Sequence, residues 1–240
     1  MRLLQELSAT WLDILALLIF VGGWLGYATF AERHARKVPS LHNAINVFRR
    51  EWMVRMIERD NRMTDVNIMR TLTRSSQFFA STTMLVLGAL IALLGYVQQT
   101  LDVVSGLPFT MKASARLLEL KIMLLVVIFI YAFFKFTWAI RQLGHCSVLI
   151  GAAPQKPKDN PEQYAPVINR VARITSYAAN NFSNGLRAYY FGLAALAWFL
   201  HPWLMVAATA WVIYILYARE FQSKTLQAMI EEDASPTLRD

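Results

Sequence analysis

Residues 78–95 read FFASTTMLVLGALIALLG, and this stretch limits the possible fold of the chain more than any other. It contains eighteen residues without a charge, and two of them are glycines, which destabilise a helix in water. With the next two residues the run reaches about 20 residues, or roughly 30 Å as an α-helix, which matches the hydrocarbon thickness of a bilayer. We therefore predict a membrane span over residues 78–97.

Other apolar runs predict further spans. The first is read as an uncleaved span because Asp13 lies near its start and no small-residue cleavage site precedes a polar mature start. The last run is too long for one span, and Pro202 interrupts it, so a hairpin of two spans is favoured over one kinked span. The expected fold is an all-α, polytopic helical membrane protein with five spans, or four in the alternative. The predicted spans cover residues 11–30, 78–97, 119–140, 185–200 and 202–218.

The distribution of basic residues predicts the orientation. The chain has 24 Lys and Arg against 16 Asp and Glu, a formal net charge of +8. Segment 31–76 holds ten of the basic residues and segment 141–187 holds six. Cytoplasmic loops carry such an excess, so both segments are expected in the cytoplasm and the N-terminus in the periplasm. Five spans then place the C-terminus, with Arg219 and Lys224, in the cytoplasm, whereas four spans would place it in the periplasm.

Two amphipathic helices are expected on the cytoplasmic side. Apolar residues recur at steps of three and four from Ser40 to Thr73, with an interruption around Arg59. The predicted cytoplasmic helices cover about 40–75 and 161–184. The second is expected to continue into the fourth span, with a possible break near Gly185. Residues 1–222 form a single transmembrane domain in this interpretation, and residues 223–240 form a cytoplasmic tail.

The sequence offers no basis for a catalytic residue, a metal site or a cofactor. Cys146 is the single cysteine and has no CxxC partner, and the four histidines lack ligand spacing. Asp60 and Asp65 are five residues apart and do not face each other on a helix. The arginines lack a nucleic-acid recognition motif, so no nucleic-acid partner is expected. An enzyme is the less favoured class, although membrane enzymes often lack soluble-enzyme motifs.

Four fragments in order, LDILALLIFVGGWLGY, FFASTTMLVLGALIALLG, HCSVLIGAAP and GLRAYYFGLAALAWFL, carry a family resemblance. Together they resemble the bacterial domain of unknown function 599 family over roughly residues 11–222. The resemblance implies a multi-pass protein of the bacterial inner (plasma) membrane. It implies no activity and no catalytic residue.

Polar residues near the predicted inner boundary are candidates for binding an ion, a ligand or a headgroup. Ionisable groups inside spans cost free energy unless they are paired or hydrated. Lys135 lies inside the third span, where snorkelling to the interface is the simple alternative. The asparagines before the fourth span either cap a helix break before Gly185 or coordinate a ligand with a nearby arginine. The candidate residues are Lys135, Asn180, Asn181, Asn184 and Arg187.

A second candidate is a charge pair at the outer side. Asp13 lies two residues into its apolar run, and Lys121 directly precedes its own, so both are expected at similar depth. A pair enters the membrane interface at lower cost than an isolated charge. Asp13 is therefore predicted to contact Lys121 or, one turn further out, Arg116. The alternative is that each reaches interfacial water separately.

Small residues suggest close helix contacts within one chain or between copies. Gly22 and Gly26 form a GxxxG pattern, and Gly88 and Gly95 lie near one face of the second span. A homo-oligomer with transport- or channel-like function is the favoured interpretation. A structural, partner-organising membrane protein is the main alternative, and an enzyme acting on lipid-linked substrates is less favoured. The expected partner is the bilayer, with the anionic headgroups of its inner leaflet.

Overall fold

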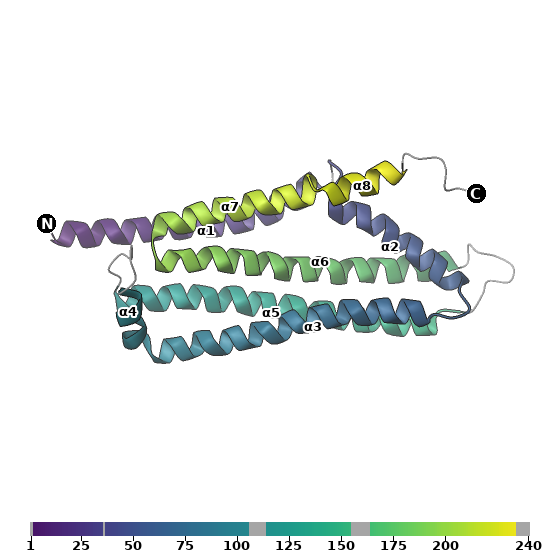
Figure 1. Ribbon diagram of the computed structural model, residues 1–240, viewed down its shortest axis with the longest axis horizontal. Helices are drawn as coiled ribbons and strands as arrows, with labels where there is room; N and C mark the ends of the chain where they lie inside the picture. The colour runs from purple at the N-terminus through teal and green to yellow at the C-terminus, as the bar shows by residue number, and fades with distance from the viewer. Residues whose placement is uncertain (1, 36, 106–113, 155–163, 234–240) are drawn as a thin grey trace. The chain divides into compact units, whose positions relative to one another are not determined.

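The computed structural model describes residues 2–35, 37–105, 114–154 and 164–233, and every regular element in these ranges is a helix (Figure 1). The all-α fold is confirmed. The helices in chain order are α1 (Arg2–His34), α2 (Leu41–Glu58), α3 (Met63–Gly95), α4 (Val97–Ser105), α5 (Ala115–Ala152), α6 (Ala165–Leu196), the 3-10 helix η2 (Ala197–Phe199), α7 (Pro202–Phe221) and α8 (Lys224–Asp233).

Four segments in the described part of the chain are long and apolar enough to cross a membrane. They are Trp11–Ala31 of α1, Met63–Gly95, Ala115–Ala152 and Pro202–Ile230. The predicted fourth span, 185–200, falls in α6, which does not meet this criterion by composition. Five spans therefore stay a prediction.

Three helices begin at a serine that caps the N-terminus. The Oγ of Ser40 accepts a hydrogen bond from Asn43 N at 3.3 Å at the start of α2. Ser114 caps α5 and Ser223 caps α8 in the same way, with donor–acceptor distances of 3.3 and 3.2 Å. Such caps satisfy amide groups that have no partner within the helix. They explain why α5 begins before the predicted span and why α8 forms within the stretch predicted to be a tail, of which 234–240 lie outside the described residues.

The predicted cytoplasmic helix 40–75 is wrong in its extent. The chain leaves α2 at Arg59 in an extended conformation (φ −78°, ψ 133°), and a new helix starts at Met63. This helix, α3, continues without a break through the predicted span 78–97 as far as Gly95. Its 33 residues correspond to about 50 Å, so it is longer than the hydrocarbon layer is thick.

The predicted helix break near Gly185 is also wrong. Helix α6 runs continuously from Ala165 to Leu196, so the asparagines from Asn180 to Asn184 cap no break. The predicted helix 161–184 and most of the predicted span 185–200 therefore belong to one helix, and η2 forms the end of that span. The predicted start at 161 lies outside the described residues.

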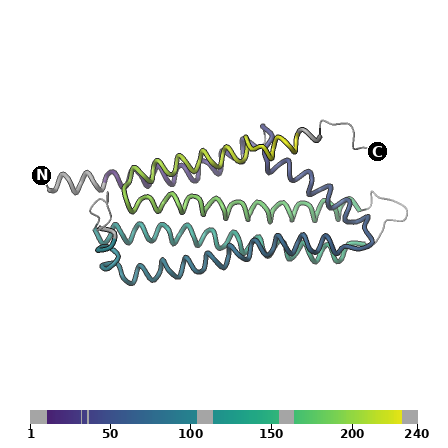
Figure 2. The backbone as a smooth tube through the Cα atoms, in the orientation of Figure 1, coloured from purple at the N-terminus to yellow at the C-terminus, as the bar shows by residue number. Residues whose placement is uncertain are grey.

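The predicted hairpin at Pro202 is present. The amides of Leu200 and His201 both donate to Ala197 O, and α7 starts with Pro202, whose missing N–H is not needed at that position. The last part of α6, from Arg187 on, and α7 then run antiparallel (Figure 2), and Arg219 Nη1 donates to the Tyr190 hydroxyl at 2.6 Å. The alternative of one kinked helix is wrong.

The chain divides into two compact units. Unit 1 comprises Met1–Val38, Met84–Tyr131 and Arg187–Arg219. Its interior contains stacked and edge-on aromatic rings: Trp24 stacks on Phe191 with centroids 5.7 Å apart, and Phe20 meets Phe191 edge-on at 5.9 Å. Small buried residues of α6, including Ala188 and Gly192, allow close approach to α5, because a Cβ on Gly192 would lie 3.2 Å from the Phe129 ring.

Unit 2 comprises Pro39–Thr83, Ala132–Leu186 and Glu220–Asp240. Its core is rich in methionine and is formed by side chains of α2, α3, α5 and α6. The fully or nearly fully buried members are Met53, Met56, Ile57, Met69, Leu143, Cys146, Ile150 and Val171. Sulfur-containing side chains are flexible and fill irregular spaces between helices.

Four of the glycines predicted to mediate helix contacts face open space within the described chain. Around Gly22, Gly26, Gly88 and Gly95 no described atom lies within 4 Å of an added Cβ, so these faces are open within the chain. Close helix contacts are made at Gly23, Gly185 and Gly192, of which Gly192 was expected from the small residues of the fourth span.

Candidate functional site

Lys135 and Asn181 of the predicted inner site lie together in unit 2. The Lys135 ammonium donates to Asn181 Oδ1 at 3.4 Å, and Asn181 Nδ2 donates to Gln142 Oε1 at 2.9 Å. Sequence reasoning missed Gln142, although it lies two turns after Lys135 on the same helix face. Asn180 and Asn184 are half-buried on α6.

Whether Arg187 joins this group stays a prediction. Arg187 belongs to unit 1, where its guanidinium carbon lies 5.8 Å from the centroid of the Tyr27 ring. This is a cation–π distance, and it gives the arginine a partner other than the asparagines. The five predicted residues are thus divided between the two units, and their joint role as one site stays a prediction.

Asp13 and Lys121 lie together in unit 1. The Lys121 Nζ is 3.8 Å from Asp13 Oδ1, and both residues are only 5% exposed. Arg116, the competing partner, is exposed. Trp198 completes the group, because its Nε1 donates to Asp13 Oδ1 at 2.6 Å and its carbonyl accepts from Lys121 Nζ at 2.8 Å. Sequence reasoning missed Trp198, which occurs in a stretch predicted to be uniformly apolar.

This group stabilises the fold and leaves little room for a ligand. The carboxylate accepts from an indole and pairs with an ammonium, and the ammonium also lies 5.3 Å from the centroid of the Trp198 ring. A buried pair satisfied in this way links α1, α5 and η2, and removing one member is expected to be costly.

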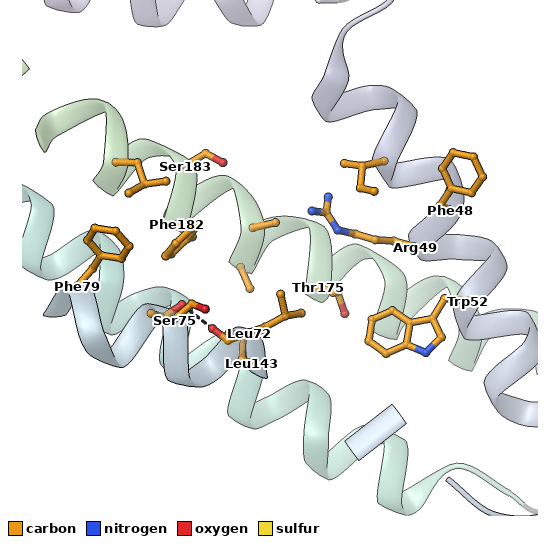
Figure 3. A pocket seen from close by; sticks show the side chains of 15 residues that line it. Phe48, Arg49, Trp52, Leu72, Ser75, Phe79, Leu143, Thr175, Phe182 and Ser183 are labelled. Atoms are coloured by element: carbon orange, nitrogen blue, oxygen red, sulfur yellow. Dashed lines mark hydrogen bonds between the residues drawn. The ribbon is translucent and has the colours of Figure 1, made fainter. Parts of the chain in front are cut away.

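A larger opening lies in unit 2. It is a cavity of about 670 Å³ between α2, α3, α5 and α6 (Figure 3). Most of its wall is apolar, with three serines and one threonine from α3 and α6 and a single arginine. The lining residues are Ile45, Phe48, Arg49, Trp52, Leu72, Ser75, Ser76, Phe79, Leu143, Thr175, Ala178, Ala179, Phe182, Ser183 and Leu186.

Aromatic rings form the end of the cavity at Phe79 and Phe182. Their centroids are 5.7 Å apart, and Phe136 packs against both, at 5.4 Å from Phe79 and 5.7 Å from Phe182. Phe136 is fully buried and occupies the space beside Gly185. This packing fixes the rings that line the cavity.

Trp52 is held in the opposite wall by a buried carboxylate. Its Nε1 donates to Asp65 Oδ1 at 2.6 Å, and Arg59 Nη1 binds the same oxygen at 2.6 Å. Asp65 is fully buried in the first turn of α3, where a helix N-terminus favours negative charge. The interaction joins the end of α2 to the start of α3 and orients the indole.

Arg49 is the only ionisable side chain among the described residues that line the cavity. It is half-buried, and burial lowers the pKa of its guanidinium below the ordinary value. Nη1 donates to Asn46 Oδ1 at 2.6 Å, and no carboxylate of the described residues lies within ion-pair distance. Sequence reasoning missed this residue, although Ile45, Arg49 and Trp52 follow helical spacing and share one face.

The comparisons with known proteins add the family. The model of the family described as "Protein of unknown function, DUF599" matches residues 15–225, which is most of the chain. The chain belongs to this family. The expected family resemblance is thereby confirmed. No curated protein and no solved structure matches this member of DUF599, so no activity can be inferred for it from a relative.

Proposed function

We propose that this DUF599 protein is an integral membrane protein that binds the apolar chain of an amphiphile from the bilayer in the cavity of unit 2. The observation that carries the proposal is the cavity itself, of about 670 Å³ with a mostly apolar lining. Cavities of roughly 300–1,000 Å³ with apolar walls and few polar groups are typical of small-molecule sites.

The sequence around the cavity supports a position at the edge of the bilayer. In α3 the last charge before the long apolar run is Arg74, and the lining residue Phe79 follows it. In α5 the apolar run ends at Arg141, two residues before the lining residue Leu143. The cavity thus lies near the ends of the apolar runs of α3 and α5, where the sequence becomes polar. With the predicted orientation this edge belongs to the cytoplasmic leaflet of the inner membrane.

Binding explains the arrangement better than transport does. The interior of unit 1 around Phe20, Trp24 and Phe191 is filled by aromatic rings, and its buried charges, Asp13 and Lys121, are paired. A permeation path would require polar groups along that interior. Homo-oligomer formation stays part of the proposal, since the open faces at Gly22 and Gly88 allow close contact with a second copy.

A photolabelling experiment tests the proposal. The full chain is reconstituted in phospholipid nanodiscs with a C18 fatty acid that carries a diazirine at mid-chain, and the adducts are mapped by mass spectrometry after irradiation. We expect the adducts to concentrate in peptides that contain Leu72–Phe79 and Thr175–Leu186, because these segments line the cavity.

Two variants of matched chemistry provide the control. Ala179→Phe fills the cavity and is expected to reduce labelling of these peptides several-fold. Ala207→Phe adds the same ring on an exposed position of α7 and is expected to leave the labelling unchanged. The proposal would be contradicted if the cavity peptides and exposed faces such as that of Leu85 were labelled to the same extent, and if neither variant changed this labelling.

A further inference from the structure

The cavity offers an unneutralised cation to whatever occupies it. Arg49 extends from α2 across the opening toward α6 (Figure 3). A guanidinium has five N–H donors in a planar fork, and Nη1 contacts only the neutral oxygen of Asn46. A half-buried arginine without a carboxylate partner is well suited to a planar oxyanion, which can accept two of these donors at once.

A hydroxyl on the facing helix, α6, is also available to bind a ligand. Ser76 and Thr175, which also line the cavity, donate to carbonyl oxygens of their own helices at 3.1 and 2.8 Å. Ser183 has no hydrogen-bond partner among the residues that the structure describes, although it is half-buried. Its hydroxyl lies on the α6 wall toward which the arginine extends (Figure 3), and it remains able to donate to a ligand.

We propose that the amphiphile is anionic, and that its carboxylate or phosphate head is bound by the guanidinium of Arg49 and the hydroxyl of Ser183. The inference rests on the proposed function, because it specifies the head group of the ligand of the same cavity. The acyl chain then lies along the aromatic wall at Phe79 and Phe182. A membrane lipid or fatty acid of the inner leaflet has this chemistry, with a charged head at the bilayer edge and a chain in the hydrocarbon.

Quenching of Trp52 fluorescence can distinguish recognition of the head group from binding of the acyl chain, since the Trp52 indole lines the cavity. The probes are 9,10-dibromostearic acid, its methyl ester and 9,10-dibromooctadecylamine, which share one quenching chain and differ in charge. Each is titrated into nanodiscs that hold the full chain, and the signal of a Trp52→Phe protein is subtracted. We expect the acid, ionised at pH 8, to bind at least about tenfold more tightly than the ester or the amine.

Substitutions assign this preference to the two residues. Arg49→Gln is expected to abolish the preference for the acid while the ester still quenches, and Arg49→Lys to retain part of it. Arg50→Gln removes the same charge from the exposed neighbour, whose Nε donates to Asn169 Oδ1, and should change nothing. Ser183→Ala should weaken binding of the acid several-fold, whereas Ser176→Ala should not, because Ser176 of the same helix lies outside the cavity lining and already donates to Ala172 O.

The outcomes distinguish the two proposals. Equal quenching by all three probes, or a preference for the acid that survives Arg49→Gln, would overturn the assignment of the head group and leave chain binding intact. No quenching of Trp52 by any probe would overturn the proposed function itself. A further titration with a brominated lysophosphatidic acid, which has a phosphate head, shows whether the carboxylate or the phosphate binds more tightly.

Discussion

Gly185 of α6 and Phe136 of α5 are in direct contact: a Cβ on Gly185 would lie 2.6 Å from Cε1 of the Phe136 ring. The ring cannot move aside easily, because it is fully buried and packs against Phe79 and Phe182. The glycine therefore permits the ring cluster that ends the cavity.

Gly185→Ala is accordingly expected to destabilise the protein by roughly 1–3 kcal/mol, as overpacking of a core does. Thermal unfolding of the purified protein in a mild detergent measures the effect. Gly144→Ala on α5 is the matched control, since its added Cβ meets no neighbouring atom within 4 Å and the position is exposed. Adding Phe136→Leu should restore part of the stability of Gly185→Ala. Equal unfolding temperatures for both single variants would contradict the prediction, because they would show that the Phe136 ring moves aside without loss of stability.

The pair of Asp13 and Lys121 gives a second prediction. Lys121→Met leaves a buried carboxylate without its ammonium and is expected to cost about 3–5 kcal/mol. Adding Asp13→Asn should recover most of the loss, because the amide oxygen still accepts from Trp198 Nε1. Exchanging the two charges should not recover it, since an ammonium would then face the indole donor. Unfolding temperature and protein level in the membrane both report the result, and recovery by the exchange would contradict this geometry.

Arg62 provides the third prediction. Its Nη1 donates to Ile150 O at 2.9 Å and to Ala153 O at 2.6 Å, and its Nη2 donates to Pro154 O. Ile150 lies in the last turn of α5, and Ala153 and Pro154 directly follow the helix end at Ala152, where carbonyls lack partners within the helix. Arg62→Ala is expected to destabilise the end of α5 by about 1–3 kcal/mol and to accelerate hydrogen exchange around Ile150. Arg70→Ala, an exposed position on α3, is the control. Unchanged exchange in Arg62→Ala would show that water replaces the side chain.

Topology is the fourth prediction. In a Cys146→Ser background, His201→Cys at the α6–α7 turn is expected to react with a membrane-impermeant thiol reagent added to the periplasmic side. Asn169→Cys, exposed on α6, should react only after the cells are opened. Labelling of both from outside, or of neither before lysis, would contradict the five-span orientation.

The centres of the helices could be predicted from the sequence, but several of their ends could not. Runs without charge identify spans because lipid excludes charged side chains. Outside the lipid a helix can continue with any composition, so polar residues before Phe78 and before Gly185 were no evidence of a helix end. The serine caps at Ser40, Ser114 and Ser223 were available signals, since serine is favoured at this position.

The two candidate sites differ in how far the sequence could predict them. Asp13 and Lys121 could be paired from depth alone, because position along a straight span gives height in the membrane. The cavity could not be found in this way, since it depends on which helices are neighbours and on how far α2 stands from α6. Arg49 looked like one more cytoplasmic charge until the structure placed it beside Phe48 and Trp52.

The most direct test of the central claim is native mass spectrometry of the full chain extracted in a neutral, mild detergent. We predict a major species with one bound anionic lipid or fatty acid per chain. This adduct should be lost in Ala179→Phe, strongly reduced in Arg49→Gln and unchanged in Arg50→Gln. A chain without any retained amphiphile, or with the same adducts in all four proteins, would contradict it.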